Sequence, residues 1–149
     1  MAFERTLNVS WAHLDANAHM ANTAYINVCI DIRMMYFASQ GFAATEFARL
    51  RIGPVVRRDE LEYHREVGLL EPITVTLALA GMAPDGSRFR LVNEVLKGDG
   101  RLAARIRSEG GWMDLAARKL IAPPDDLCRA LAAMPHATEF EILPSSIRT

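Results

Sequence analysis

Residues 15–25, D-A-N-A-H-M-A-N-T-A-Y, concentrate more chemically capable groups than any other stretch of this chain. Asp15 supplies a base or a nucleophile and His19 a hydrogen-bond donor or acceptor, while Asn22 and Thr23 are side chains able to cap a following helix. The first N–H groups of a helix lack internal partners and carry partial positive charge, so they can polarise a carbonyl oxygen as negative charge develops on it. A carboxylate just upstream of such donors suits attack on an acyl group.

This segment resembles the D-x-x-G-H-x-N-N-x-x-Y signature of hotdog-fold acyl-CoA thioesterases of the 4-hydroxybenzoyl-CoA thioesterase type. The resemblance rests on Asp15, His19, Asn22 and Tyr25, and Asp31 and Arg33 continue it after the tyrosine. The sequence departs from the signature at Ala18, where the family usually has Gly, and at Ala21, where it often has the first Asn. Both departures keep the polar groups, but Gly reaches positive φ freely and Ala does not.

The resemblance implies hydrolysis of a thioester to a carboxylic acid and free coenzyme A, without a cofactor or a metal. In this interpretation Asp15 is the nucleophile or the general base for water, and amides near Asn22 and Thr23 stabilise the oxyanion. His19 and the Asn22 side chain orient the water or the thioester, and Tyr25 shapes the pocket. The resemblance also implies a homodimer or homotetramer with its sites at a dimer interface.

Two groups of arginines are candidates for binding the phosphates of coenzyme A. The first group, which we predict to bind the substrate, is Arg57, Arg58 and Arg65 near the second long strand. The second group is Arg101, Arg105 and Arg107 along the last strand. Alternation places this second group opposite the apolar residues of the same strand, so a solvated outer face is an equally good interpretation of it.

Composition limits the class of protein. With 149 residues, of which 50% are hydrophobic, we expect one domain over residues 1–149 with a substantial core. Seventeen basic and eighteen acidic residues give a formal charge of −1, which argues against binding nucleic acid through the overall field. We find no membrane span and no apolar signal segment, and interpret Cys29 and Cys128 as reduced thiols. We therefore expect a cytoplasmic protein.

The hydropathy pattern predicts the elements that position the loop. Residues 22–40 are apolar around most of a helix that Gly41 ends, and such a helix, roughly 28 Å long, needs neighbours on most sides. Alternating residues predict strands within 3–11, 60–67, 73–79, 88–95 and 101–107, with turns at 84–86 and 98–100. This order predicts an α+β hotdog fold, in which a curved antiparallel sheet wraps one long central helix.

The remaining regions carry no predicted chemistry. Residues 42–53 fit a short helix or a loop. The run from Ala122 to Met134 predicts a Pro-started, Asp-capped C-terminal helix that packs on the domain or covers a sheet edge. Beyond Pro135 we expect order only where another surface holds the chain.

Other kinds of site and function were weighed against thioester hydrolysis. His13, Asp15 and His19 include the ligand types of a metal site, but the loop fixes no coordination geometry, so we predict no metal. The G-x-S-x-G, P-loop and dinucleotide-binding motifs are absent from the sequence. Two rivals remain: a hotdog enoyl-CoA hydratase or dehydratase, and a non-catalytic module that binds acyl thioesters. The sequence also leaves open whether coenzyme A or acyl carrier protein carries the acyl group.

Overall fold

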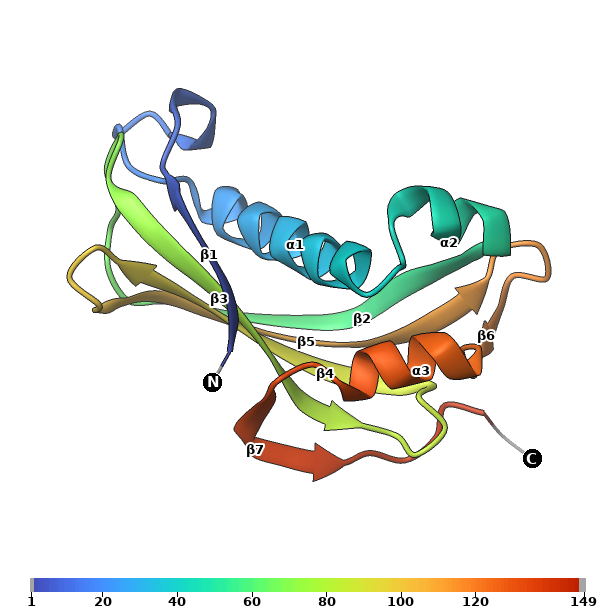
Figure 1. The fold of residues 1–149 in the computed structure, drawn as a ribbon. Coiled ribbons are helices and arrows are strands. Elements are labelled where there is room, and N and C mark those ends of the chain that lie inside the picture. The colour runs from blue at the N-terminus through green and yellow to red at the C-terminus, as the bar shows by residue number, and fades with distance from the viewer. Residues whose placement is uncertain (1, 148–149) are drawn as a thin grey trace.

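A computed structural model describes residues 2–147 as a curved sheet with a long helix against its concave face (Figure 1). The N-terminal part forms β1 (Phe3–Asn8), a short 3-10 helix (Trp11–His13), α1 (Asn22–Ser39) and α2 (Ala44–Leu50). The strands that follow are β2 (Ile52–Tyr63), β3 (Pro72–Met82), β4 (Arg88–Lys97), β5 (Leu102–Asp114) and β6 (Lys119–Ile121). The C-terminal part forms α3 (Asp125–Ala132) and β7 (His136–Ile142).

The main strands lie in the order β1-β3-β4-β5-β2, and every neighbouring pair in this row is antiparallel. β6 pairs with β5, while β7 runs parallel to β3 along the edge that β1 leaves free. β2 is the last strand of the row, so within residues 2–147 its outer edge has no partner strand. The predicted α+β hotdog architecture, with its short C-terminal helix, is confirmed.

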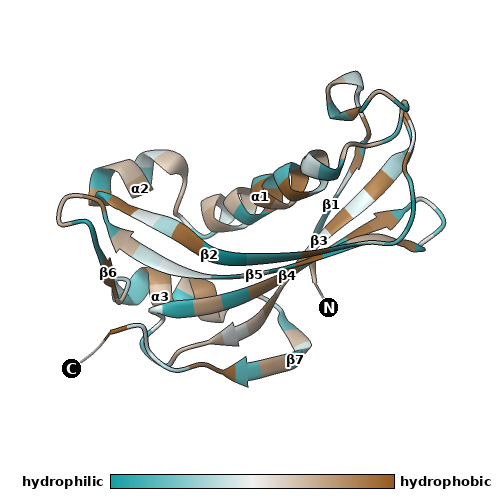
Figure 2. Ribbon diagram, turned by 180° about the vertical axis from the view of Figure 1, so that it is seen from behind, coloured by the Kyte–Doolittle hydropathy of each residue, from teal (hydrophilic) through white to brown (hydrophobic). Residues whose placement is uncertain are grey.

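Helix α1 is covered on one face only. Val28, Ile32 and Tyr36 are buried against the sheet, whereas Ile30 and Met35 are 44% and 48% exposed. The expectation that neighbours surround most of this helix is therefore wrong for a single chain, because the curved sheet reaches only its inner side. Figure 2 shows apolar residues along α1 and a polar stretch in the middle of β2.

An aromatic cluster fills the core where the C-terminal end of α1 meets the sheet. Trp112 of β5 is fully buried, and its ring centroid lies 5.5 Å from that of Phe37, 5.9 Å from that of Phe47 and 5.4 Å from that of Phe89. Helix α3 joins the same core, because the Tyr36 hydroxyl donates to the Ala130 carbonyl at 2.6 Å. These contacts fix the helices against the sheet.

A buried polar row crosses the sheet beneath α1. Arg33, which is 6% exposed, donates from Nε to Asn93 Oδ1 at 2.9 Å and from Nη2 to Ser108 Oγ at 2.7 Å. Asn93 Nδ2 donates to the Thr76 carbonyl at 2.8 Å, and Ser108 Oγ donates to the Asp59 carboxylate. Burial lowers the pKa of the Arg33 guanidinium. The row thus ties α1 to four neighbouring strands.

Several local predictions are confirmed, and others are wrong. The predicted turns at 84–86 and 98–100 are present, with Gly86 and Gly100 at φ +74° and +86°. The predicted first strand ends at Asn8, so Trp11 lies in the 3-10 helix and is 78% exposed. The N-cap of α3 is Pro124 rather than an aspartate, because both acidic residues lie inside its first turn. Within residues 2–147, no helix is both long and apolar enough to span a membrane.

Candidate active site

The loop before α1 closes on itself around Asp15. The Asp15 N–H donates to the His19 carbonyl at 2.9 Å. The carboxylate oxygen Oδ1 of Asp15 accepts the N–H groups of Asn17 at 2.8 Å and His19 at 3.3 Å. Within the described residues, Oδ2 has no hydrogen-bond partner. One carboxylate oxygen therefore shapes the loop, and the other accepts no hydrogen bond from the described residues.

Ala18 adopts the backbone conformation for which the family signature usually has glycine. Its φ is +59°, and its N–H donates to the Asp15 carbonyl at 3.1 Å. An L-residue in this left-handed region costs about 1–2 kcal/mol because its Cβ approaches the following carbonyl oxygen. The alanine thus keeps the loop geometry at a cost in stability.

Helix α1 begins without a side-chain cap. Asn22 and Thr23 are its first two residues, and the N-cap is Ala21, whose methyl group accepts no hydrogen bond. The expectation that Asn22 or Thr23 caps this helix is therefore wrong, because the chain enters helical geometry one residue earlier. No acidic residue occupies the first turn, so the partial positive charge of the helix start is not neutralised there by its own residues.

Five of the eight predicted site residues line one cavity of about 390 Å³. They are Asp15, His19, Asn22, Tyr25 and Arg65. The sequence analysis missed the other five lining residues, which are Asn17, Met20, Tyr63, His64 and Glu66. These come from the loop itself and from the end of β2 with the segment after it, two parts of the chain about 40 residues apart. Only the fold brings them together.

Two tyrosines form one wall of this cavity. The rings of Tyr25 and Tyr63 meet edge to face with centroids 5.4 Å apart. The Tyr25 hydroxyl donates to the Arg65 carbonyl at 3.4 Å, and the Tyr63 hydroxyl donates to the Asn22 carbonyl at 3.0 Å. Burial, together with the neighbouring Tyr63 and Glu66, raises the pKa of Tyr25, so its phenol stays protonated and remains a donor. Tyr63 thereby ties the start of α1 to β2.

A second carboxylate faces the histidine of the loop. His19 Nε2 lies 3.4 Å from Glu66 Oε2, and the His19 backbone forms an isolated bridge with Gly68. The side chain of Glu66 is mostly exposed, so the pair adds little stability. The contact places the His19 imidazole beside the Glu66 carboxylate in the lining of the cavity. Nothing in the sequence around Glu66 indicated that its side chain lies beside His19.

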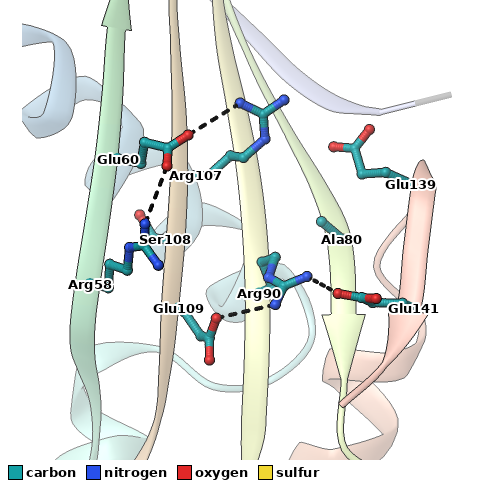
Figure 3. A pocket seen from close by; sticks show the side chains of 9 residues that line it. All are labelled: Arg58, Glu60, Ala80, Arg90, Arg107, Ser108, Glu109, Glu139 and Glu141. Atoms are coloured by element: carbon teal, nitrogen blue, oxygen red, sulfur yellow. Dashed lines mark hydrogen bonds and ion pairs between the residues drawn. The ribbon is translucent and has the colours of Figure 1, made fainter.

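The other three predicted residues lie apart from the cavity. Thr23 is exposed on α1, and Arg57 is exposed at the irregularity between Val56 and Arg58. Arg58 lines a different cavity, of about 430 Å³, and its Nη2 lies 3.5 Å from Glu60 (Figure 3). The structure therefore brings only Arg65 of the three predicted phosphate-binding arginines to the loop.

The outer face of the sheet carries a ladder of ion pairs. Arg105 Nη2 lies 2.7 Å from Glu94 Oε2, and Arg107 Nη1 lies 2.8 Å from Glu62 Oε1. In Figure 3, Arg90 bridges two strands in the same way. These arginines point away from Ile106, as alternation predicts, and their partners are acidic side chains of neighbouring strands. The solvated-face interpretation therefore fits Arg105 and Arg107.

A family model described as the Thioesterase-like superfamily matches residues 9–131. This chain belongs to that superfamily. The match spans the loop around Asp15, the helix α1 and four strands of the main row, β2, β3, β4 and β5. Membership supports the prediction of a thioester hydrolase. A comparison of the sequence with curated proteins gives no match.

Several solved structures share the fold of this chain. A Staphylococcus aureus protein solved in complex with CoA is 23% identical, with a TM-score of 0.80, covering 93% of this chain and 89% of that one. A 1,4-dihydroxy-2-naphthoyl-CoA thioesterase from Synechocystis is 14% identical, with a TM-score of 0.80, covering 92% and 100%. A 12:0-ACP thioesterase from Umbellularia californica is 18% identical, with a TM-score of 0.73, covering 88% and 52%.

The His13 side chain forms a hydrogen bond within its own turn. His13 Nδ1 accepts the Ser10 N–H at 3.0 Å, which directs this ring back to its own turn. Across residues 2–147, His, Cys, Asp and Glu side chains form no group of three or more arranged to hold a metal ion.

Proposed function

We propose that this chain hydrolyses an acyl-CoA thioester to a carboxylic acid and free coenzyme A. The observation that carries the proposal is the placement of the Asp15 carboxylate and the uncapped first turn of α1 around one cavity. A nucleophile or base and a set of oxyanion donors are the two requirements of acyl transfer. The family description supports the same class of reaction.

Asp15 acts in one of two ways, and both use its free oxygen. As a nucleophile, Oδ2 attacks the thioester carbonyl carbon, the C–S bond breaks to release the coenzyme A thiolate, and water then cleaves the resulting anhydride. As a general base, Oδ2 takes a proton from a water molecule that attacks the same carbon, and the C–S bond of the resulting tetrahedral intermediate then breaks to release the acid and the coenzyme A thiolate. In both routes the N–H groups of the first turn stabilise the oxyanion, and His19 and Asn22 orient the reactants.

The acyl carrier in this proposal is coenzyme A. One similar structure holds CoA and another is named as a CoA thioesterase, whereas a third is named as an ACP thioesterase. The proposal is tested with a panel of acyl-CoA esters of different chain length and aromaticity, assayed by thiol release. Free thiol supports it. Hydration of enoyl-CoA without thiol release identifies a hydratase, and tight binding without turnover identifies a non-catalytic module.

We also propose that the active protein is a homodimer or homotetramer. The outer edge of β2 is unpaired within residues 2–147, and exposed apolar side chains lie on α1 and β2, including Ile30, Met35 and Val56. A symmetric partner would bury both features. Light scattering at micromolar concentration is expected to show a dimer or tetramer, and an active monomer would contradict this assembly.

A cytoplasmic location is part of the same proposal. Cys29 is buried, and both Cys29 and Cys128 are free thiols, as expected for a protein in a reducing compartment. Expression of the natural gene product with a fluorescent tag tests the location directly. An extracellular or periplasmic signal would contradict it.

A further inference from the structure

A second cavity adjoins the catalytic one and is lined by three cations. It measures about 460 Å³, and its positive side chains are Arg65, Lys97 and Arg101. His19, Arg65 and Glu66 line both cavities, so the two are continuous at the His19 end of the catalytic loop. A ligand that enters the catalytic cavity from this side passes the three cations.

Backbone hydrogen bonds fix where these cations lie. In the β4–β5 hairpin, the Lys97 N–H donates to the Arg101 carbonyl at 2.8 Å, and the Gly100 N–H donates to the Lys97 carbonyl at 2.8 Å. Arg65 follows β2, and its N–H donates to the Ala103 carbonyl at 3.1 Å. The hairpin and the end of β2 therefore hold the three side chains at one corner of the sheet.

The cations are only partly neutralised by the protein. Lys97 Nζ lies 3.0 Å from Glu71 Oε1, and Arg101 Nε lies 2.7 Å from Asp99 Oδ2. Arg65 Nη1 donates to the Leu102 carbonyl at 2.7 Å, and no carboxylate of residues 2–147 forms an ion pair with it. A guanidinium with one neutral acceptor keeps several donors for an anion.

The two carboxylates in the lining already have partners of their own. Glu71 Oε2 accepts the Gly68 N–H at 2.8 Å, and this bond together with Lys97 lowers the pKa of Glu71. Glu66 lies beside His19. Asp99, which pairs with Arg101, brings the carboxylates near the three cations to three, so the charges at this corner balance. Arg65 has no carboxylate partner among residues 2–147, so its guanidinium is free to pair with an anionic ligand.

We propose that the cavity of Arg65, Lys97 and Arg101 binds the phosphates of coenzyme A and thereby selects thioesters that carry the nucleotide. This inference rests on the proposed function. Arginine and lysine are the usual protein partners of phosphate, arginine through bidentate hydrogen bonds and lysine as a point charge. The phosphate-binding group is then Arg65 with two residues of the β4–β5 hairpin, and Arg57 and Arg58 are not part of it.

The inference is tested by binding and by kinetics on two substrates. Calorimetry measures the Kd of adenosine 3′,5′-bisphosphate, the nucleotide end of coenzyme A without its thioester, for the wild type, Lys97→Gln and Arg101→Gln. Each substitution is expected to raise this Kd about tenfold, the effect of losing one exposed charge-assisted contact. The KM for the best acyl-CoA rises by the same factor at unchanged kcat, whereas kcat/KM for the matching N-acetylcysteamine thioester stays unchanged.

Arg129→Gln is the matched control, because Arg129 is an exposed arginine paired with a nearby aspartate on α3. It is expected to change neither measurement. The inference would be overturned if Lys97→Gln and Arg101→Gln kept the wild-type Kd. It would also be overturned if these variants lost kcat/KM equally on both thioesters, or if Arg58→Gln raised the Kd more than they do. Nucleotide binding that depends on Lys97 and Arg101, in a protein that hydrolyses no thioester, would support the inference and refute the proposed function.

Discussion

Replacing Asp15 with Asn removes the carboxylate while keeping the shape of the loop. Asp15 Oδ1 accepts the N–H groups of Asn17 and His19, and the amide oxygen of Asn can accept both. An amide neither attacks a thioester effectively nor takes a proton from water at neutral pH. The substitution therefore separates the chemical role of Asp15 from its role in closing the turn.

The structure sets the size of both effects. The two hydrogen bonds change only from charge-assisted to neutral and remain exposed, so we expect the free energy of unfolding to change by less than about 1 kcal/mol. Loss of a positioned base or nucleophile is expected to lower kcat by about a hundredfold or more, which corresponds to about 2.7 kcal/mol of transition-state stabilisation. Substrate binding is expected to survive, so the variant retains intact acyl-CoA.

The assay is thiol release from the best acyl-CoA of the panel, with thermal unfolding measured in parallel. Asp114→Asn is the matched control, because Asp114 Oδ1 accepts two backbone N–H groups, of Ala116 and Ala117, each at 2.9 Å in a remote turn. It is expected to keep the wild-type rate. If Asp15→Asn kept most of its activity, the carboxylate would only close the loop, and the catalytic centre would lie elsewhere.

Three further results are expected. Ala18→Gly removes the strain of the positive φ but adds freedom to the unfolded chain. Calorimetry should therefore show that the free energy of unfolding rises by about 0.5–1 kcal/mol, and a lower Tm would contradict this. Ser108→Ala leaves an Arg33 donor buried without its acceptor, so urea unfolding should show a loss of about 1–3 kcal/mol, whereas an unchanged midpoint would refute it. Burial raises the pKa of Cys29 to about 12, so native protein at pH 8 should resist thiol reagents there. Because the unfolded thiol ionises near pH 9.0, Cys29 stabilises the fold below that pH and this contribution is lost as the pH rises toward 12. Labelling of Cys29 in the folded protein at pH 8 would contradict its burial.

Local patterns predicted the elements that local chemistry determines. The period of apolar residues predicted α1 to within one residue at its C-terminal end, and the glycines at 86 and 100 marked the hairpin turns. Alternation also placed Arg105 and Arg107 on the outer face. These features depend on residues close together in the chain.

The features that were missed depend on distant contacts. β7 was not predicted although Phe140 and Ile142 alternate with Glu139 and Glu141, because this run is short and its order depends on backbone pairing with β3, more than 50 residues earlier. In the sequence, Lys97 is only the last residue of a strand, and the β4–β5 hairpin brings it into the same cavity as Arg65. Likewise, no periodicity shows that the polar groups of Arg33 and Ser108 meet across 75 positions of sequence.

The buried polar row of Arg33 also fixes the position of α1 along the sheet. Apolar contacts are non-directional, so a helix held by them alone could slide along the sheet with little change in buried area. A shift of one turn, about 5.4 Å, would remove Arg33 from Asn93 and Ser108 and strand a buried charge, a loss of several kcal/mol. The start of α1 is rigidly joined to this point about three turns away, so the row fixes how far the helix reaches toward Asp15. A redesigned core that replaced the row with well-packed apolar side chains would gain or keep stability while losing the alignment of α1 with the loop around Asp15.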